Sequence, residues 1–197
     1  MDLIIIGIGK HSDVVYDIAK LLGYNIINKV SYKINTSNNS LEKLDNKSKY
    51  KFIIGIGDVF LRKEINDKYK LNYITLIHPS SYISNNVKIG KGTLVCAGAI
   101  IQTHSNIGDH CIINTKSSVD HHCLLGNFIN ISPGCTLCSS IKIDNLVFIG
   151  ASTTIIPEIN IGENSIIGAG SLVLKNIKKN KKCYGSPCKE ISDLFII

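Results

Sequence analysis

Two adjacent histidines, His121 and His122, follow Asp120 in a stretch that otherwise consists of aliphatic and small residues. The charge of imidazole changes close to neutral pH, so histidine is the side chain most often used as a general base. A third histidine, His104, lies eighteen residues before His122. These residues could take up a proton during a group transfer, bind an anion, form half of a zinc site, or simply be surface histidines.

A second group with chemical potential lies in the turn Gly7-Ile8-Gly9-Lys10-His11. This turn follows a buried strand and opens a helix, where backbone N–H groups bind ligands in open α/β sheets. Ser12 stands where the dinucleotide fingerprint has its third glycine, and no acidic residue ends the next strand, so the sequence argues against NAD. His11 is a titratable side chain at the position of such a ligand.

The elements that carry the histidine pair repeat every six residues, a period that neither a helix nor an ordinary strand explains. Such a period is typical of a parallel β-helix. If each coil has three faces of six residues, residues that are eighteen apart in sequence stack on one another. His104 should therefore stack on His122 at about one strand spacing, ~4.8 Å, and both adjacent histidines should lie at a corner. The sixteen aliphatic residues in phase are Ile83, Ile89, Val95, Ile101, Ile107, Ile113, Val119, Leu125, Ile131, Leu137, Ile143, Ile149, Ile155, Ile161, Ile167 and Val173.

Residues 1–77 follow another pattern, in which apolar strands alternate with amphipathic helices. We expect strands at 3–6, 25–30, 52–56 and 73–77, helices after Gly9 and Asp58, and a polar loop with a short helical piece at 36–51. This order predicts a small Rossmann-like α/β domain with a parallel sheet. The predicted domains are thus 1–77, a parallel β-helix at 78–174, and a C-terminal capping tail at 175–197.

The composition narrows the class of protein and its compartment. The 197 residues are 44% hydrophobic and 19% charged, with a net charge of +7 and seven cysteines. We expect a cytoplasmic protein, because the cysteines are odd in number and no signal peptide or long apolar span is present. The basic net charge does not indicate nucleic-acid binding, because the sequence contains no recognisable nucleic-acid-binding module. The lysine-rich tail is either solvated or attracts a phosphorylated ligand.

Three of the cysteines, Cys111, Cys123 and Cys135, fall four residues after an in-phase aliphatic residue. Alanine, serine and threonine fill the same slot elsewhere, which predicts a small wall position and a packing role. We expect no metal site, because zinc needs three or four ligands and His110 lies one face away from the other histidines.

Several segments together resemble the bacterial sugar acetyltransferases of the left-handed β-helix superfamily. The closest type is the sialic-acid O-acetyltransferase-like group, which includes the UDP-4-amino-sugar (bacillosamine pathway) and perosamine N-acetyltransferases. The resemblance covers nearly the whole chain in the same order. It is carried by Gly7–His11, Leu76–Ser80, Asn114-Thr115, Val119–Cys123, Ser132–Gly134 and Tyr184–Pro187.

The resemblance implies a homotrimer with active sites between subunits, acetyl-CoA as cosubstrate, and a nucleotide-linked sugar held by the N-terminal domain. It implies that His121 is the catalytic base and that His122, the residue after it, takes part with it. The pathway class would be polysaccharide biosynthesis. The positions that match the acceptor loops are Gly9, Lys10, His11, Gly57 and Arg62, and those that match the acetyl-CoA channel are Asn130, Ala151 and Ala169.

Two departures from the group bear on function. Relatives usually carry Asp or Glu where this chain has His122, and a neutral imidazole can orient the base but cannot stabilise its charge as a carboxylate does. The acidic pair that meets the nucleotide is also missing, with Ser31 and Tyr32 near its place, which favours an acceptor other than a UDP-sugar.

The predicted activity is transfer of acetyl from acetyl-CoA to the amino group of a nucleotide-linked 4-amino-deoxy sugar. O-acetylation of a sialic-acid-like sugar is the alternative within the same enzyme class. A non-catalytic β-helix that binds a sugar nucleotide and a γ-type carbonic anhydrase are the alternatives from other classes.

Overall fold

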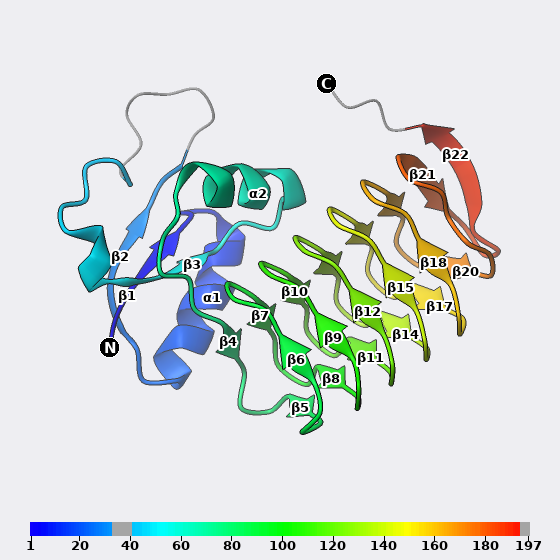
Figure 1. Ribbon diagram of the computed structural model, residues 1–197, viewed down its shortest axis with the longest axis horizontal. Coiled ribbons are helices and arrows are strands. Elements are labelled where there is room, and N and C mark those ends of the chain that lie inside the picture. Colours follow the sequence, from blue (N-terminus) through cyan, green and yellow to red (C-terminus); the bar gives the residue numbers. More distant parts are fainter. Residues whose placement is uncertain (33–40, 194–197) are drawn as a thin grey trace.

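The computed structural model describes residues 1–32 and 41–193 and consists of an α/β domain and a triangular β-solenoid (Figure 1). In the α/β domain, β1 (Asp2–Ile6), β2 (Asn25–Val30) and β3 (Lys51–Ile54) form a parallel sheet in the order β2-β1-β3. The expected strands at 3–6 and 25–30 are confirmed, and the one expected at 52–56 is present but ends at Ile54. Of the polar segment expected at 36–51, residues 36–40 lie outside the described residues, and the remainder includes a short 3₁₀ helix, η1 (Lys47–Lys49).

Two helices cover the two faces of this sheet, which is why β1 and β3 are apolar and buried after their first residue. Helix α1 (Lys10–Leu21) begins at Gly9. Helix α2 (Val59–Lys68) begins at Asp58, whose Oδ1 accepts a hydrogen bond of 2.8 Å from the backbone N–H of Leu61. Such an N-cap contributes about 1 kcal/mol to helix stability. Both helices therefore start at the carboxyl edge of the sheet.

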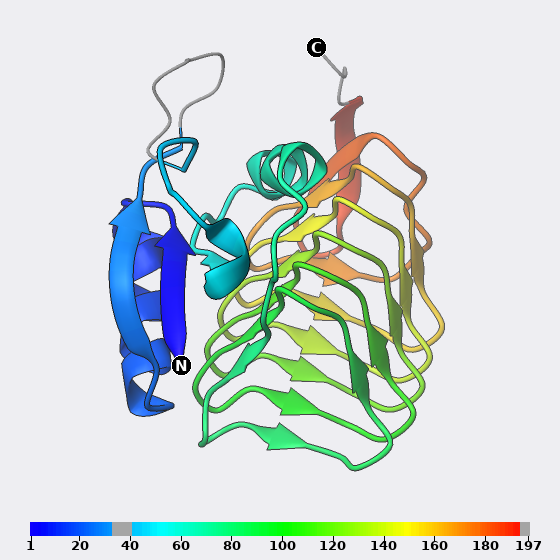
Figure 2. The same ribbon diagram turned by 60° about the vertical axis from the view of Figure 1, so that its left-hand side comes forward.

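The solenoid has three faces, and the coils stack on each as parallel strands (Figure 2). We name them the docked face, the second face and the third face. The docked face contains β4 (Leu76–Ile77), β7 (Leu94–Val95), β10 (Ile112–Ile113), β13 (Asn130–Ile131), β16 (Phe148–Ile149), β19 (Ile166–Ile167), β21 (Lys181–Tyr184) and β22 (Lys189–Asp193). The second face contains β5 (Tyr82–Ile83), β8 (Ile100–Ile101), β11 (Ser118–Val119), β14 (Thr136–Leu137), β17 (Thr154–Ile155) and β20 (Leu172–Val173). The third face contains β6 (Lys88–Ile89), β9 (Asn106–Ile107), β12 (Leu124–Leu125), β15 (Lys142–Ile143) and β18 (Asn160–Ile161).

The strand register confirms the period of eighteen. Val119 pairs with Ile101 in the coil before it and with Leu137 in the coil after it, and nearly all of the in-phase aliphatic residues form one buried cluster. From residue 92 to residue 170, every sixth residue has a positive φ, and only four of these fourteen residues are glycine. The chain therefore turns each corner through a single left-handed residue, three positions after the inward-facing aliphatic one.

The three wall cysteines are packing residues, as the sequence predicted. Cys111, Cys123 and Cys135 are fully buried, and burial raises the pKa of each thiol. Each thiol donates a hydrogen bond to a carbonyl oxygen fifteen residues later, at 3.1 to 3.2 Å. The hydroxyl of Ser105, in the same slot, donates to such a carbonyl at 2.7 Å.

The α/β domain packs on the docked face of the solenoid. Val15 and Ile18 of α1 share a buried cluster with Leu94 and Ile112, whose side chains point outward from the docked face. The expected strand at 73–77 is wrong as a single element of the α/β sheet. Tyr73 makes only an isolated bridge to Phe52, whereas β4 pairs with β7 in the solenoid. The boundary after residue 77 stays a prediction.

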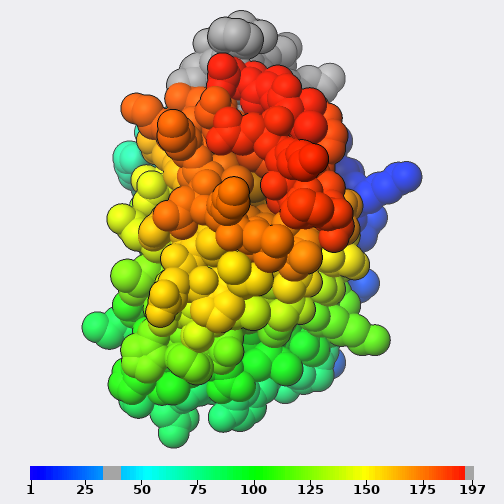
Figure 3. All heavy atoms as spheres, turned by 90° about the vertical axis from the view of Figure 1, so that its right-hand side faces the viewer, coloured from blue at the N-terminus to red at the C-terminus, as the bar shows by residue number. Residues whose placement is uncertain are grey.

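The described part of the C-terminal segment extends the docked face. Strand β21 pairs in parallel with β19, and β22 folds back antiparallel on β21. These residues, orange to red in Figure 3, lie over the end of the solenoid. Lys181 contacts Glu190 and Asp193 at 3.2 and 2.6 Å, so one of the tail lysines is neutralised within the chain. Residues 194–197 of the predicted tail lie outside the described residues.

Replacing Cys135 tests the wall assignment. We expect Cys135→Ser to cost less than about 1 kcal/mol of unfolding free energy, because a hydroxyl can donate the same hydrogen bond. Cys135→Leu should cost about 1–3 kcal/mol, because the filled wall has no space for the added carbons. Urea unfolding of both variants measures this, and a serine variant less stable than the leucine variant would contradict it.

Candidate functional site

The histidine pair lies at the corner between the second and third faces. His122 has φ 60°, and so has His104 one coil earlier. The His104 and His122 rings stack with centroids 5.0 Å apart and planes tilted by 35°, which confirms the predicted stacking. Nδ1 of His121 lies 3.0 Å from Nδ1 of His122, with the rings edge to face. His121 and His122 are exposed, so the corner presents a hydrogen-bonded imidazole pair to its surroundings.

Backbone and carboxylate hydrogen bonds hold this corner in place. The His122 backbone N–H donates to the carbonyl of Thr103 at 3.1 Å, and the His121 carbonyl accepts from Ser140. Oδ1 of Asp120 accepts from the backbone N–H of His121 at 2.8 Å. The nearest carboxylate in sequence thus fixes the main chain of His121 rather than its ring.

A hollow of about 280 Å³ lies on the second face beside this corner. Its floor is formed by short polar side chains, Ser118 and Thr136, which project outward from β11 and β14. A reacting group could therefore reach the corner along this face. The lining residues are Ile100, Gln102, Ser118, Val119, Asp120, Thr136, Leu137 and Cys138.

The predicted acceptor loops meet at the carboxyl edge of the α/β sheet. Gly7 has φ +131°, and a Cβ there would lie 2.8 Å from the carbonyl oxygen of Gly55, so only glycine allows the two loops to approach. Gly9 and Lys10 are exposed, while His11 and Gly57 are half-buried. The Nε2 atom of His11 is buried without a hydrogen-bond partner. Burial and, to a smaller extent, the charge of Arg62 lower the pKa of His11, so its neutral form is favoured.

Arg62 lies inside the junction of the two domains rather than facing a ligand. Its side chain is 1% exposed. Its guanidinium donates to the carbonyls of Ile56 and Gly57 in its own domain and of His110 and Ile129 in the solenoid, at 2.8 to 3.2 Å. Burial lowers the pKa of Arg62 to about 10. The structure therefore gives Arg62 an anchoring role that differs from the predicted acceptor contact.

The spacing of α2 contained the signal for this buried arginine. Val59, Arg62 and Ile65 are three apart and are the buried residues of the helix, which is the spacing of an inward-facing stripe. His110 is also buried at the junction, stacked on Phe128 with ring centroids 5.3 Å apart, and neither ring nitrogen has a partner. Burial lowers the pKa of His110 to about 4, so this imidazole is neutral at physiological pH.

The predicted acetyl-CoA residues gather at the docked face and at the corner that follows it. Ala151 and Ala169 are eighteen residues apart on successive coils of that corner, and the backbone N–H of Gly170 donates to the carbonyl of Ala151. Asn130 of β13 is 5% exposed, and its Nδ2 donates to Oγ of Ser132 at 3.0 Å. The amide of Asn130 is therefore already hydrogen-bonded within the chain.

Within one chain, the predicted site residues fall into separate groups. The acceptor loops and the predicted channel residues lie with the docked face, on which the α/β domain packs. His121 lies between β11 and β12, which puts it at the corner opposite the docked face. Among residues 1–32 and 41–193, no three His, Cys, Asp or Glu side chains are grouped to hold a metal ion. In the same ranges, no helix has the length and apolar character needed to span a membrane.

Comparison with known proteins agrees with this architecture. Residues 2–69 match the PglD N-terminal domain. That match, together with the solenoid and the structural relatives described next, supports the resemblance to the hexapeptide left-handed β-helix acyltransferase group.

Two solved structures are similar over almost the whole chain. The acetyltransferase domain of PglB from Neisseria gonorrhoeae is 29% identical with a TM-score of 0.88, covering 96% of this chain and 99% of that one. PerB from Caulobacter crescentus, in complex with CoA and GDP-perosamine, is 28% identical with a TM-score of 0.89, covering 98% of each chain.

Curated relatives match over a shorter stretch. The galactoside O-acetyltransferase of Escherichia coli (strain K12) is 46% identical over 54 residues, which are 27% of each protein. The enzyme of the same name from Lactococcus lactis is 46% identical over 48 residues, covering 24% of this chain and 23% of that one. The chain thus matches about a quarter of the length of these relatives.

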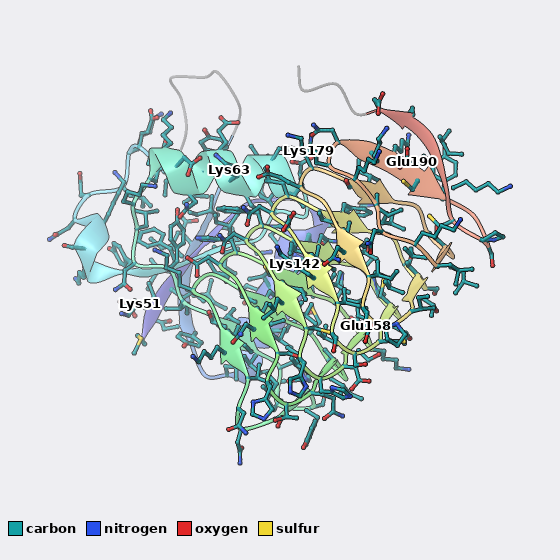
Figure 4. All side chains as sticks on the ribbon, turned by 45° about the vertical axis from the view of Figure 1, so that its right-hand side comes forward. Lys51, Lys63, Lys142, Glu158, Lys179 and Glu190 are labelled. Atoms are coloured by element: carbon teal, nitrogen blue, oxygen red, sulfur yellow. The ribbon has the colours of Figure 1, made fainter. Side chains whose placement is uncertain are left out.

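The anchoring role of Arg62 can be tested by substitution. We expect Arg62→Met to lower the unfolding free energy by about 3 kcal/mol or more, because several buried carbonyls lose their donor. Lys63→Ala is the matched control, since Lys63 is an exposed residue of the same helix (Figure 4) and should change stability by at most about 0.5 kcal/mol. Equal urea midpoints for the two variants would refute the anchoring role.

Proposed function

We propose that the protein transfers the acetyl group of acetyl-CoA to the amino group of a nucleotide-linked 4-amino-deoxy sugar. The observation that carries this proposal is the similarity, over 96–98% of the chain, to two acetyltransferases, one solved with CoA and GDP-perosamine. A further structure of the PglB domain contains acetyl coenzyme A. An imidazole pair exposed at a solenoid corner is consistent with this chemistry.

In the proposed reaction, His121 is the general base. The sugar amine attacks the thioester carbonyl of acetyl-CoA, the new C–N bond forms, and Nε2 of His121 takes the proton from the attacking nitrogen. Backbone N–H groups of the solenoid stabilise the oxyanion. The C–S bond then breaks, and the proton passes to the departing CoA thiolate, so that no covalent enzyme intermediate is needed. Acetyl-CoA lies near Asn130, Ala151 and Ala169.

The acceptor binds at the loops that contain Gly9, Lys10, His11 and Gly57. Their backbone N–H groups at the start of α1, together with the charge of Lys10, suit the phosphates of a nucleotide sugar. Arg62 supports this region from below, because its guanidinium holds the carbonyl of Gly57 at 2.8 Å.

The active site lies between subunits of a homotrimer. The separation described above supports this, because the acceptor loops and His121 of one chain lie in different groups. A neighbouring copy can supply the loops, and closed symmetric oligomers repeat such a contact at every interface.

O-acetylation of a sugar hydroxyl is the second candidate. It is favoured by the 46% identity, over 48 and 54 residues, to two galactoside O-acetyltransferases. The same base would take the hydroxyl proton. A non-catalytic sugar-nucleotide-binding β-helix would bind the same ligands without turnover.

A panel of acceptors and a base variant test the activity. We expect acetyl-CoA turnover with GDP-, UDP- or dTDP-linked 4-amino sugars and little with a galactoside or a sialic acid. His121→Ala should lower kcat by about 10²–10⁴-fold, the usual contribution of a general base. A near wild-type rate for this variant would rule out His121, and nucleotide-sugar binding without turnover by the wild type would favour the non-catalytic alternative.

Mixed oligomers test the location of the site. One chain carries His121→Ala and the other carries Lys10→Ala with His11→Ala, and each is expected to be nearly inactive alone. Co-expressed chains should recover activity at about a quarter of the sites, because one of four pairings joins an intact base to intact loops. No recovery in mixed trimers verified by mass spectrometry would show that each site is built within one chain.

A further inference from the structure

We infer that His122 and His104 are positioning residues that together take the place of a carboxylate beside the base. This inference rests on the proposed function of His121. In this arrangement, His122 accepts the hydrogen bond that orients the ring of His121, and His104 holds the ring of His122 by stacking. The geometry at the corner supports each step.

The first step concerns the proton on His121. A base that accepts a proton at Nε2 must carry its own proton on Nδ1, because a neutral imidazole has one donor and one acceptor nitrogen. The Nδ1 atom of His121 has one partner, Nδ1 of His122 at 3.0 Å. His121 therefore donates, His122 accepts, and the proton of His122 lies on Nε2. This hydrogen bond selects the tautomer of His121 that leaves Nε2 free.

The second step concerns the orientation of His122. An exposed imidazole at a corner would ordinarily sample several rotamers. Here the His104 ring lies 5.0 Å from the His122 ring, within the distance at which aromatic pairs attract each other. The backbone holds this distance, because the N–H of His122 is bonded to the carbonyl of Thr103, the neighbour of His104. His104 thus limits the positions from which His122 can accept.

The third step concerns the other titratable groups at this corner. Oδ1 of Asp120 already accepts a hydrogen bond from the backbone N–H of His121. The thiol of Cys123 is buried and donates to the carbonyl of Cys138. Among the residues that the structure describes, no hydrogen bond joins a carboxylate to the ring of His121 or His122. The orientation of the base therefore depends on the imidazole of His122.

A loss of positioning can be distinguished from a loss of folding by substitutions that preserve the left-handed backbone conformation of the corner. Phe128 has φ 58° and Asn164 has φ 57° at the equivalent position of another corner, so His122→Phe and His104→Asn should fold. His122→Phe keeps a ring for stacking but has no acceptor, whereas His122→Asn and His122→Glu keep an acceptor oxygen. Glu158→Asn is the matched control, because Glu158 (φ 65°) lies on the same corner two coils further on (Figure 4).

The kinetic readout is kcat and KM for acetyl-CoA. We expect His122→Phe to lower kcat at least about tenfold with KM changed less than about twofold, because orientation of the base matters in the transition state. His104→Asn should lower kcat about three- to tenfold, while His122→Glu retains or exceeds wild-type kcat and Glu158→Asn matches the wild type. Wild-type kcat in His122→Phe, or equal kcat in His104→Asn and Glu158→Asn, would overturn the inference.

Nitrogen-15 NMR of the imidazoles gives a readout that does not depend on turnover. We expect the proton of His121 on Nδ1 and that of His122 on Nε2 in the wild type, and loss of the Nδ1–H preference in His122→Phe. A protein that acetylates no acceptor but shows these tautomers would refute the proposed function and retain the positioning. The opposite tautomers, or stoichiometric zinc that is lost in His122→Phe, would overturn the positioning role itself.

Discussion

The structure depends on the backbone hydrogen bonds that join each coil of the solenoid to the next. The carbonyls and N–H groups of one coil bond the coil eighteen residues away, so a residue's position in the period sets its neighbours. His122 lies over His104, and Ala169 lies over Ala151, for this reason alone. The inward aliphatic residues fill the interior of the triangle, and the small wall residues hydrogen-bond the next coil. At the corner between the third and docked faces, side-chain oxygens of Asp and Asn residues add hydrogen bonds to the backbone of the preceding coil.

The periodic half of the molecule could be predicted almost completely from sequence, and the α/β half less so. The six-residue phase gave the faces, the corner position of His122 and the stacking on His104, because a single register relates all of them. The strand expected at 73–77 is divided between two sheets, since Tyr73 and Leu76 pair with different partners. The local sequence does not determine which sheet each residue joins, because this depends on how the two domains pack together.

Arg62 illustrates the same limit at the level of a single residue. Its position beside the acceptor loops is consistent with a ligand contact, and its charge suggests one. Its partners are carbonyls of residues 56, 57, 110 and 129, and two of these belong to the other domain. Only the packing of α2 against the solenoid makes the anchoring role visible. A buried cation surrounded by carbonyls also explains why the neutral form is favoured for nearby His11.

The left-handed corner residues have a consequence for how this scaffold can change. Ten of the fourteen are not glycine and range from Lys116 and Glu158 to Phe128. His110, Phe128 and Asn164 are buried, but the exposed ones leave the coil without contributing to its closure. A mutation there can exchange one functional group for another while the free energy of folding stays nearly constant. Chemistry at the corners can therefore diverge between relatives independently of the fold, and exchange of an acid for an imidazole beside a base is one step of that kind.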